Sequence, residues 1–275
     1  MSDKPRIVIV NYNGAAYVGA AIESALHQTT RCEIVVVDNA STDDSRELLQ
    51  RYDVRLVESE RNSGFAVAAN TGAFLPTENV PPYIAFLNPD ATAENTWIER
   101  IVAWMESRDI AFASSVVAGG DRPFFSGGRW LPWLGAAVTR SSYTGERTAW
   151  LSGCALVACR ESFEAVGGFD GRYFLYFEDV DLSLRARRKG FTLGVNPEPL
   201  VSHPAHGRST NQLGQMRKYA IGYYSKGAML RRFLYPLQWI TAAPFQLILS
   251  PLMEGASPRL LPTTARAFLR GVFKR

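Results

Sequence analysis

The sequence predicts an α/β fold, with a mostly parallel sheet covered by helices on both faces and a helical extension at the C-terminus. Short β-branched apolar runs alternate with stretches of helical periodicity through the first hundred of the 275 residues. Three of the four runs are apolar throughout or after their first residue, which is typical of strands buried on both faces. The 47% hydrophobic content supplies a core for one large domain or two modest ones and excludes a disordered or fibrous chain.

Four strand–helix units account for the first part of the chain. The expected strands are 6–10, 33–37, 54–57 and 83–87, and the expected helices are 18–26, 45–52, 65–75 and 94–106. Ligands of such sheets bind beyond the carboxyl ends of the strands. Acid and amide side chains that follow three of the strands should therefore meet at one edge, namely Asn11, Asn13, Asp38, Asn39, Asn88 and Asp90.

The middle of the chain is less regular. Gly, Pro and aromatic residues are frequent in 119–145 and predict loops and short antiparallel strands. A strand at 155–159, a short helix that stops at 167–168, a helix from 178 to 189 and a strand at 191–195 are expected to follow.

Each candidate group at these ends has a functional and a structural interpretation. Asp38 could accept hydrogen bonds from a nucleobase or ribose, or it could organise the turn before the next helix. Asn88-Pro89-Asp90 could bind a cation or a diphosphate, or it could form an ordinary turn. Glu178 and Asp179 lie between an aromatic run and a helix, where a carboxylate could be a general base or a first-turn acid.

Other motifs narrow the classes of function and the compartment. His203 and His206 could bind metal or phosphate, or they could be ordinary loop residues. No dinucleotide-binding glycine motif, P-loop or nucleophile elbow occurs in the sequence, so dehydrogenase, NTPase and hydrolase functions have no support. The cysteines, Cys32, Cys154 and Cys159, predict neither a disulfide nor a metal pair. With no signal-peptide pattern at the start, a reducing cytoplasm is the expected compartment.

The charge is divided unevenly along the chain. Residues 1–204 contain 19 Lys and Arg against 25 Asp and Glu, whereas residues 205–275 contain 11 against Glu254 alone. A basic end of this kind indicates contact with an anionic surface. No nucleic-acid recognition motif accompanies it, so an anionic membrane is the expected partner and nucleic acid is not.

The end of the chain predicts helices with an unusual apolar stretch. A helix is expected at 212–232, and the 21 residues of 233–253 carry no charge, close to the roughly 20 needed to span a bilayer. Three prolines and several polar residues interrupt this stretch. A segment lying in the membrane interface, or a helical hairpin packed on the preceding domain, is therefore expected in place of a transmembrane helix.

Seven ordered motifs resemble those of family 2 glycosyltransferases of the GT-A fold, in particular the rhamnosyltransferase-like branch. They span roughly residues 6–210 and are, in order, Ile7–Gly14, Val37–Ser45, Asn62–Ala66 with Asn70, Leu87–Ala91, Gly167–Asp170, Phe177–Arg185 and Val201–His203. The resemblance implies a GT-A catalytic domain at 1–210 and a basic, apolar helical extension at 211–275.

The resemblance also implies a role for each matching residue. Asp38 is expected to contact the nucleotide base, Asp90 to bind the divalent metal, and His203 to be a further metal or diphosphate ligand. Asp179 is expected to be the catalytic base, with Glu178 beside it. The other expected contacts to the sugar nucleotide are Asn11, Asn13, Asn62, Gly64, Asn70 and Asn88, and the expected acceptor-side residues are Trp150, Asp170 and Phe177. Asn88 replaces the first acid of the family's Asp-x-Asp motif.

These roles imply inverting sugar transfer with Mg²⁺ or Mn²⁺ as cofactor. The expected donor is dTDP-L-rhamnose, and the expected acceptor is a glycan or lipid-linked glycan of polysaccharide or cell-wall biosynthesis. The expected location is the inner face of the cytoplasmic membrane, with peripheral attachment. The alternatives are a UDP- or GDP-sugar donor and, because Asn88 departs from the motif, a catalytically silent nucleotide-sugar or glycan-binding protein.

Overall fold

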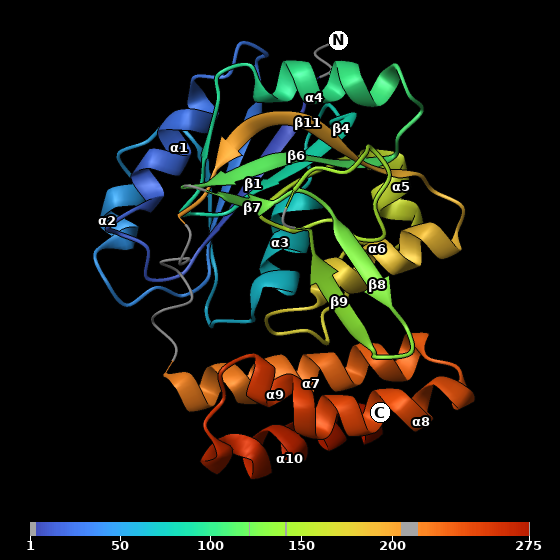
Figure 1. The fold of residues 1–275 in the computed structure, drawn as a ribbon. Helices are drawn as coiled ribbons and strands as arrows, with labels where there is room; N and C mark the ends of the chain where they lie inside the picture. Colours follow the sequence, from blue (N-terminus) through green and yellow to red (C-terminus); the bar gives the residue numbers. More distant parts are fainter. Residues whose placement is uncertain (1–3, 121, 141, 205–213, 275) are drawn as a thin grey trace.

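The computed structural model describes residues 4–120, 122–140, 142–204 and 214–274 and confirms the predicted α/β fold with a helical extension (Figure 1). Nine strands form one mixed sheet, and two further strands form a separate hairpin. The three cysteines are free, as predicted. The expected domain boundary at residue 210 lies outside the described residues.

The first four strands are parallel and lie in the order β3-β2-β1-β4. The elements of this half are β1 (Arg6–Asn11), α1 (Val18–Leu26), β2 (Glu33–Asp38), α2 (Ser45–Leu49), β3 (Arg55–Glu58), α3 (Phe65–Ala73), β4 (Tyr83–Leu87) and α4 (Trp97–Glu106). Figure 1 shows α3 and α4 on opposite sides of the sheet. A Cβ added at Gly72 of α3 would meet Val8 Cγ1 at 2.6 Å, so this glycine allows the helix to pack closely on β1.

The second half of the sheet mixes strand directions. Its elements are β5 (Thr92–Ala93), β6 (Phe112–Gly119), β7 (Arg122–Phe125), β10 (Ala155–Cys159), α5 (Arg160–Ala165), α6 (Glu178–Arg188) and β11 (Leu193–Ser202), and the hairpin is β8 (Gly128–Leu131) with β9 (Ala136–Thr139). Strand β10 runs antiparallel between β4 and β6, whereas β11 is parallel to β6. Its antiparallel direction brings Ala155, at the start of β10, beside Leu87 at the carboxyl end of β4.

Helix α2 and strand β11 differ in length from the sequence prediction, and strand β6, which lies between β10 and β11, was not expected. Helix α2 ends at Leu49 and is shorter than expected. Strand β11 continues to Ser202, past the predicted end at Val195, with a register shift between Asn196 and Val201. Pro197 and Pro199 lie within that interval and have no N–H to donate, which explains why the sequence pattern appeared to stop there.

The extension forms a helical layer beneath α6 and the hairpin (Figure 1). Its helical segments are α7 (Gln215–Phe233), η1 (Pro236–Gln238), α8 (Trp239–Pro244), η2 (Phe245–Leu249), α9 (Ser250–Met253), η3 (Pro258–Leu260) and α10 (Leu261–Phe273). Gly227 and Gly271 let α7 and α10 pack closely, because a Cβ at either would lie within 2.2 Å of the other helix's backbone. No helix among the described residues is long and apolar enough to cross a membrane.

Candidate active site

Asp38 ends β2 and is fully buried in a network of hydrogen bonds. Its Oδ1 accepts from Asn11 Nδ2 at 3.0 Å and from Ser41 Oγ at 2.5 Å. Its Oδ2 accepts from the Ser41 N–H at 3.0 Å and from Arg46 Nε at 3.3 Å. Because every one of these partners belongs to the protein, the turn-organising role of Asp38 is present in this structure, and its contact with a nucleotide base stays a prediction.

The loops after β1 and β2 are tied to one another around this network. The Asn13 N–H donates to Ser41 Oγ at 2.9 Å, and Asn13 Oδ1 accepts from the Thr42 N–H at 2.7 Å. Asn13 and Ala40 both adopt left-handed backbone conformations, with φ of 51° and 64°. Such conformations are uncommon for residues other than glycine and concentrate at functional sites. The two loops therefore form one preorganised rim at the sheet edge.

Asn39 connects this rim to the loop that starts α3. Its Nδ2 donates to Asn62 Oδ1 at 3.1 Å and to the Gly64 carbonyl at 3.2 Å, and its Oδ1 accepts from the Ser63 N–H. Gly64 has φ of 85°, and a Cβ there would lie 2.3 Å from the Phe174 carbonyl oxygen. Glycine is therefore required at this position, where two loops of the candidate site meet.

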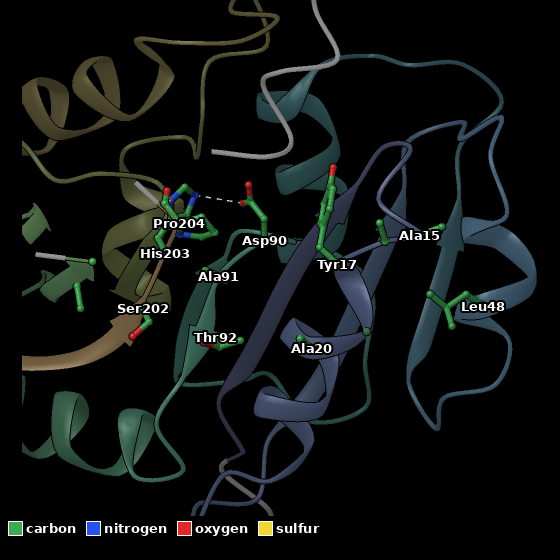
Figure 2. A pocket seen from close by; sticks show the side chains of 14 residues that line it. Ala15, Tyr17, Ala20, Leu48, Asp90, Ala91, Thr92, Ser202, His203 and Pro204 are labelled. Carbon is green, nitrogen blue, oxygen red and sulfur yellow. Dashed lines mark hydrogen bonds and ion pairs between the residues drawn. The ribbon is translucent and has the colours of Figure 1, made fainter. Parts of the chain in front are cut away.

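A cavity of about 560 Å³ lies on the other side of the β1 loop, and Asp90 and His203 line it (Figure 2). Asp90 Oδ1 and His203 Nε2 are 3.1 Å apart, and both side chains are almost completely buried. Asn88 Nδ2 lies 3.4 Å from the same histidine nitrogen. The Phe124 ring stacks on the imidazole at 4.3 Å between centroids and fixes its plane. The structure thus joins the Asn88-Pro89-Asp90 motif to the end of β11.

The Asp90–His203 pair fits a divalent cation. His203 Nδ1 lies 2.8 Å from the Pro204 carbonyl oxygen, which can only accept, so Nδ1 is the protonated nitrogen. In the neutral ring Nε2 then carries the lone pair, and a cation between it and the Asp90 carboxylate would satisfy both groups. Neighbouring ligands of an octahedral Mg²⁺ lie about 3 Å apart, since each bond is about 2.1 Å. Among the described residues no cluster of three or more His, Cys, Asp or Glu could hold a metal, but nucleotide sites commonly complete the shell with phosphate oxygens and water.

Tyr17 is a cavity residue that the sequence analysis missed. Figure 2 shows its ring beside Asp90. Burial, and then the charges of Asp90 and Asp43, raise the pKa of Tyr17 to about 12. The Tyr17 ring therefore lies between the rim of the β1 loop and the Asp90 carboxylate. An aromatic residue a few positions after a strand end was the only available signal in the sequence.

Asp179 and Glu178 form the first turn of α6. Asp179 Oδ2 accepts from the Gly153 N–H at 3.0 Å, and its Oδ1 accepts from the Val180 N–H at 2.8 Å. Burial raises the pKa of Asp179 despite these hydrogen bonds. Burial and then the charge of Asp179 raise the pKa of Glu178 as well. Two carboxyl groups in one low-dielectric turn thus favour one ionised and one protonated partner.

The antiparallel strand β10 links Asp90 to Asp179. The Asn88 N–H donates to the Cys154 carbonyl at 2.9 Å, so the segment that holds Asp179 through Gly153 is bonded to the Asn88-Pro89-Asp90 motif. Burial first, and then the charges of Asp90 and Asp179, raise the pKa of the Cys154 thiol. The backbone hydrogen bond and the pairing of β10 with β4 thus bring the segments of Asp90 and Asp179 together.

The backbone before α6 is unusual. Tyr176 and Phe177 are consecutive left-handed residues, with φ of 68° and 66°. Four of the five non-glycine residues with positive φ in the described chain lie at this site: Asn13, Ala40, Tyr176 and Phe177. This concentration of strain independently indicates function at the strand ends and at the start of α6.

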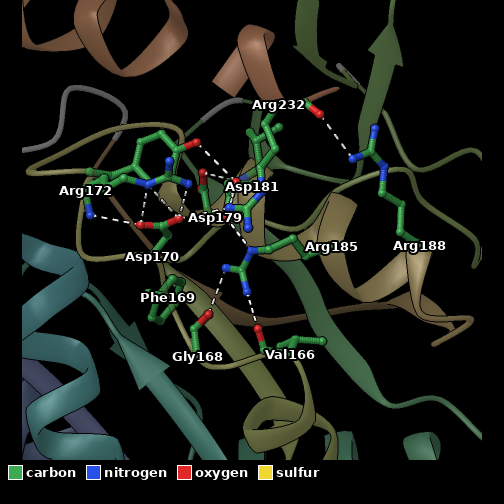
Figure 3. A network of polar contacts seen from close by, with 12 residues as sticks. Val166, Gly168, Phe169, Asp170, Arg172, Asp179, Asp181, Arg185, Arg188 and Arg232 are labelled. Atoms are coloured by element: carbon green, nitrogen blue, oxygen red, sulfur yellow. Dashed lines mark hydrogen bonds and ion pairs between the residues drawn. The ribbon is translucent and has the colours of Figure 1, made fainter. Parts of the chain in front are cut away.

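An ionic network holds α6 against the extension (Figure 3). Arg185 Nε donates to the buried Asp181 Oδ2 at 2.6 Å, and Arg232 of α7 reaches Asp181 Oδ1 at 3.0 Å and Asp170 Oδ2 at 2.9 Å. Burial alone would raise the pKa of Asp170, but hydrogen bonds from Arg172 and the charges of Arg172 and Arg232 lower it to about 2. Asp170 therefore has structural partners in this network, and its acceptor-side role stays a prediction.

Two other predicted residues also have structural partners. The Asn70 amide donates to the Phe169 carbonyl at 2.7 Å and accepts from the Phe169 N–H at 2.9 Å, so it clamps α3 to the segment before α6. Trp150 is buried against Phe125, and its Nε1 donates to the Arg129 carbonyl at 3.3 Å. Both polar groups thus have backbone partners in this structure, and the ligand-binding roles expected for Asn70 and Trp150 stay predictions.

The arrangement of this mixed sheet is that of the GT-A fold, which solved glycosyltransferase structures share. The chain belongs to glycosyl transferase family 2. The sequence profile of that family matches residues 6–167, which is more than half of the sequence. The predicted family, fold and enzyme class are therefore confirmed.

Curated relatives are sugar transferases. N-acetylglucosaminyl-diphospho-decaprenol L-rhamnosyltransferase of Mycobacterium tuberculosis is 29% identical, over 75% of this chain and 78% of that protein. dTDP-rhamnosyl transferase RfbF of Shigella flexneri is 25% identical, over 75% of this chain and 71% of that protein. Among solved structures, the mannosyltransferase PcManGT from Pyrobaculum calidifontis, in complex with GDP-Man and Mn²⁺, matches with a TM-score of 0.63 and 18% identity, over 99% of this chain and 76% of that one.

Proposed function

We propose that this glycosyltransferase transfers L-rhamnose from dTDP-L-rhamnose to a lipid-linked glycan with inversion at the anomeric carbon. The observation that carries the reaction type is the desolvated Asp179 at the start of α6, bonded through the Gly153–Cys154 segment to the motif that contains Asp90. The donor and acceptor are supported by the relatives, one named for dTDP-rhamnose and one for a diphospho-decaprenol acceptor.

The residues divide the reaction between them. The rim formed by Asn11, Asn13 and Asp38 orients the nucleotide, and the Asp90–His203 pair faces the diphosphate. Asp179 accepts the proton of the acceptor hydroxyl as that oxygen attacks the anomeric carbon and the nucleoside diphosphate leaves. Its raised pKa makes it a stronger base than an exposed aspartate. Single displacement requires no covalent enzyme intermediate.

A divalent cation fits this scheme. Asp90 and His203 would hold Mg²⁺ or Mn²⁺, which when bound neutralises charge on the departing diphosphate. Asn88 Nδ2 lies 3.4 Å from His203 Nε2, and its neutral amide stands where a second carboxylate would add charge. We expect metal dependence with weaker affinity than a two-acid motif would give.

We further propose that residues 1–210 are the catalytic domain and that residues 211–275 hold it on an anionic membrane, at the inner face of the cytoplasmic membrane. Ten of the eighteen large hydrophobic side chains exposed in the described chain belong to the extension. They include Tyr235, Ile240, Met253 and Phe273, each about 70% exposed or more. Exposed bases on α10 accompany them, a combination that suits the interface of an anionic bilayer.

Two measurements test the donor and the reaction. A thermal-shift panel of dTDP-, UDP- and GDP-sugars, with and without Mn²⁺, should show the largest stabilisation with dTDP-L-rhamnose and metal. Product analysis by NMR should then show inverted anomeric configuration in the transferred sugar. Preferential stabilisation by a UDP- or GDP-sugar, or retention of configuration, would contradict the corresponding part of the proposal.

A further inference from the structure

A second cavity lies between the segment before α6 and the first half of α7. Its volume is about 410 Å³, within the range of small-ligand sites, and it shares no lining residue with the cavity at Asp90 and His203. Tyr176 and Phe177 form one side, and Tyr219 and Tyr223 of the extension form the other. The catalytic domain and the extension thus enclose it together.

Polar groups occupy one end of this aromatic cavity. Lys226 Nζ pairs with Glu254 Oε1 at 2.7 Å, and Tyr223 Oη donates to Glu254 Oε2 at 3.1 Å. The Glu254 side chain is 47% exposed, so its carboxylate remains within reach of a ligand. Lys226 also lies over the Tyr223 ring, 4.2 Å from its centroid. Aromatic faces next to a fixed acid–base pair provide both the flat apolar surfaces and the hydrogen-bonding groups that a sugar ring requires.

Gly222 supplies an independent observation. It lines the cavity from the interior of α7, where glycine costs helix stability. Gly227 in the same helix is explained by close packing, since a Cβ there would lie 2.2 Å from the Phe268 carbonyl oxygen. At Gly222 the nearest atom to an added Cβ is Tyr176 Cδ2, at an ordinary 3.7 Å. Packing therefore does not require this glycine, and its missing side chain leaves the cavity open.

The cavity adjoins the catalytic turn through the chain itself. Phe177 is its lining residue and also the residue from which α6 begins, directly before Glu178 and Asp179. Tyr176 and Phe177, the two left-handed residues directly before α6, both line the cavity. Ser225 of α7 donates to the Leu175 carbonyl at 2.9 Å and ties the extension to the same segment.

We propose that this cavity binds the saccharide unit of the acceptor, so that the extension completes the active site in addition to any role at the membrane. The inference rests on the proposed transfer to a glycan acceptor. The sugar ring stacks between the tyrosines of α7 and Phe177, and its hydroxyls meet the Lys226–Glu254 pair. The nucleotide binds instead at the rim around Asp38 and in the cavity at Asp90 and His203.

The test uses the full-length protein and N-acetylglucosamine diphosphate carrying a short prenyl chain as the probe. Binding is measured by calorimetry, and donor hydrolysis by water is followed separately because it needs no acceptor. Gly222→Leu fills the cavity and should weaken probe binding at least about tenfold, whereas Gly222→Ala, whose Cβ has room, should change it less than about threefold. Tyr219→Ala removes a stacking face and should weaken binding about three- to tenfold. Tyr219→Phe keeps the ring and should bind as the wild type does. Donor hydrolysis should stay unchanged in all four.

The outcomes separate this inference from the proposed function. Equal probe affinity in Gly222→Leu, Tyr219→Ala and wild type would overturn the acceptor cavity, and so would equal losses in Gly222→Leu and Gly222→Ala. If the wild type binds the probe and the variants lose it as expected, but no rhamnose is transferred from dTDP-L-rhamnose, the donor assignment fails and the cavity stands.

Discussion

The strand-end site and the C-terminal extension differ in which side chains they bury and which they expose. At the strand ends, carboxyl groups are buried and their hydrogen bonds go to neighbouring loops, as the four donors around Asp38 show. In the extension, large apolar side chains such as Ile240 and Phe273 face outward. A nucleotide diphosphate has a fixed shape and charge, so its site can be rigid in advance. The lipid-linked acceptor that we propose would require an open, apolar surface.

Backbone strain distinguishes the same two regions. The site contains four left-handed non-glycine residues, whereas the described part of the extension, residues 214–274, contains none. Holding residues such as Ala40 and Phe177 in this conformation costs of order 1 kcal/mol or more each, so the surrounding contacts must fix them. Preorganisation is thus concentrated where the proposed mechanism places the moving charge, and Arg232 of the extension pairs with carboxylates on and beside α6.

The largest effect is expected at the catalytic turn. Asp179→Asn keeps the size of the side chain but removes the base, so kcat should fall about 10²- to 10⁴-fold. Donor binding should persist, because the nucleotide rim does not involve this residue. Steady-state transfer rates and a thermal shift with donor measure the two quantities. Full activity in Asp179→Asn would exclude this residue as the base.

The pH dependence sharpens that expectation. Burial raises the pKa of Asp179, and a base must be deprotonated to act. Activity should therefore be lost as pH falls through a value above that of an ordinary aspartate, by about tenfold per pH unit below it. A profile of kcat against pH measures this limb. An acid limb at or below pH 4 would contradict a desolvated base.

A smaller effect is expected at the nucleotide rim. Asp38→Asn places an amide where the carboxylate accepts from Asn11, Ser41 and Arg46, so the unfolding free energy should fall by about 1–3 kcal/mol. Nucleotide affinity should weaken about tenfold because the rim loses its anchor. Denaturant unfolding and calorimetry with dTDP check these values.

Asp44→Asn is the matched control for the rim. Asp44 lies in the same turn, is exposed and makes no side-chain cap for α2. Asp44→Asn should therefore leave the unfolding free energy and the nucleotide affinity unchanged. If Asp38→Asn lowers stability but leaves nucleotide affinity unchanged, Asp38 organises the turn and does not contribute to nucleotide binding.

Sequence patterning predicted the strand ends but not every partner found there. Asp38 and Asp90 could be placed because apolar runs mark where buried strands stop. The clamp made by Asn70 could not, since Phe169 is 99 residues away in sequence and no local pattern encodes the contact. Arg232 was missed for the same reason, because its carboxylates lie on segments far along the chain.

The extension shows where patterning stops being informative. The uncharged stretch was correctly predicted not to form one spanning helix, because its prolines and polar residues were visible. The cavity at Gly222 was not predictable, since a helix-interior glycine has the same appearance whether it serves packing or a ligand. Only the position of Tyr176 across from it distinguishes the two cases.

Membrane contact should respond to the exposed apolar side chains of the extension. Ile240→Asp or Phe273→Asp should weaken binding to anionic vesicles about tenfold, because each places a charge where an apolar group enters the interface. Raised salt should weaken binding further by screening the basic residues. Val80→Asp, an equally exposed substitution in the catalytic half, is the control for cosedimentation. If raised salt and both extension variants leave vesicle affinity unchanged, the extension does not bind the membrane.

The smallest effect is expected where the two regions meet. Arg232→Met removes ion pairs to Asp170 and to the buried Asp181, and Arg185 still neutralises Asp181, so unfolding free energy should fall by only about 1–2 kcal/mol at pH 7. The pKa of Asp170 is about 2 in the folded protein, below its unfolded value, so its contribution is present above about pH 4 and is lost as pH falls toward 2. The difference between Arg232→Met and wild type should therefore shrink over that interval, as urea titrations at several pH values would measure. Arg232→Lys keeps the charge and should recover part of the loss. A difference that stays constant from pH 7 to 2 would mean that Arg232 joins the extension to α6 through packing and not through these carboxylates.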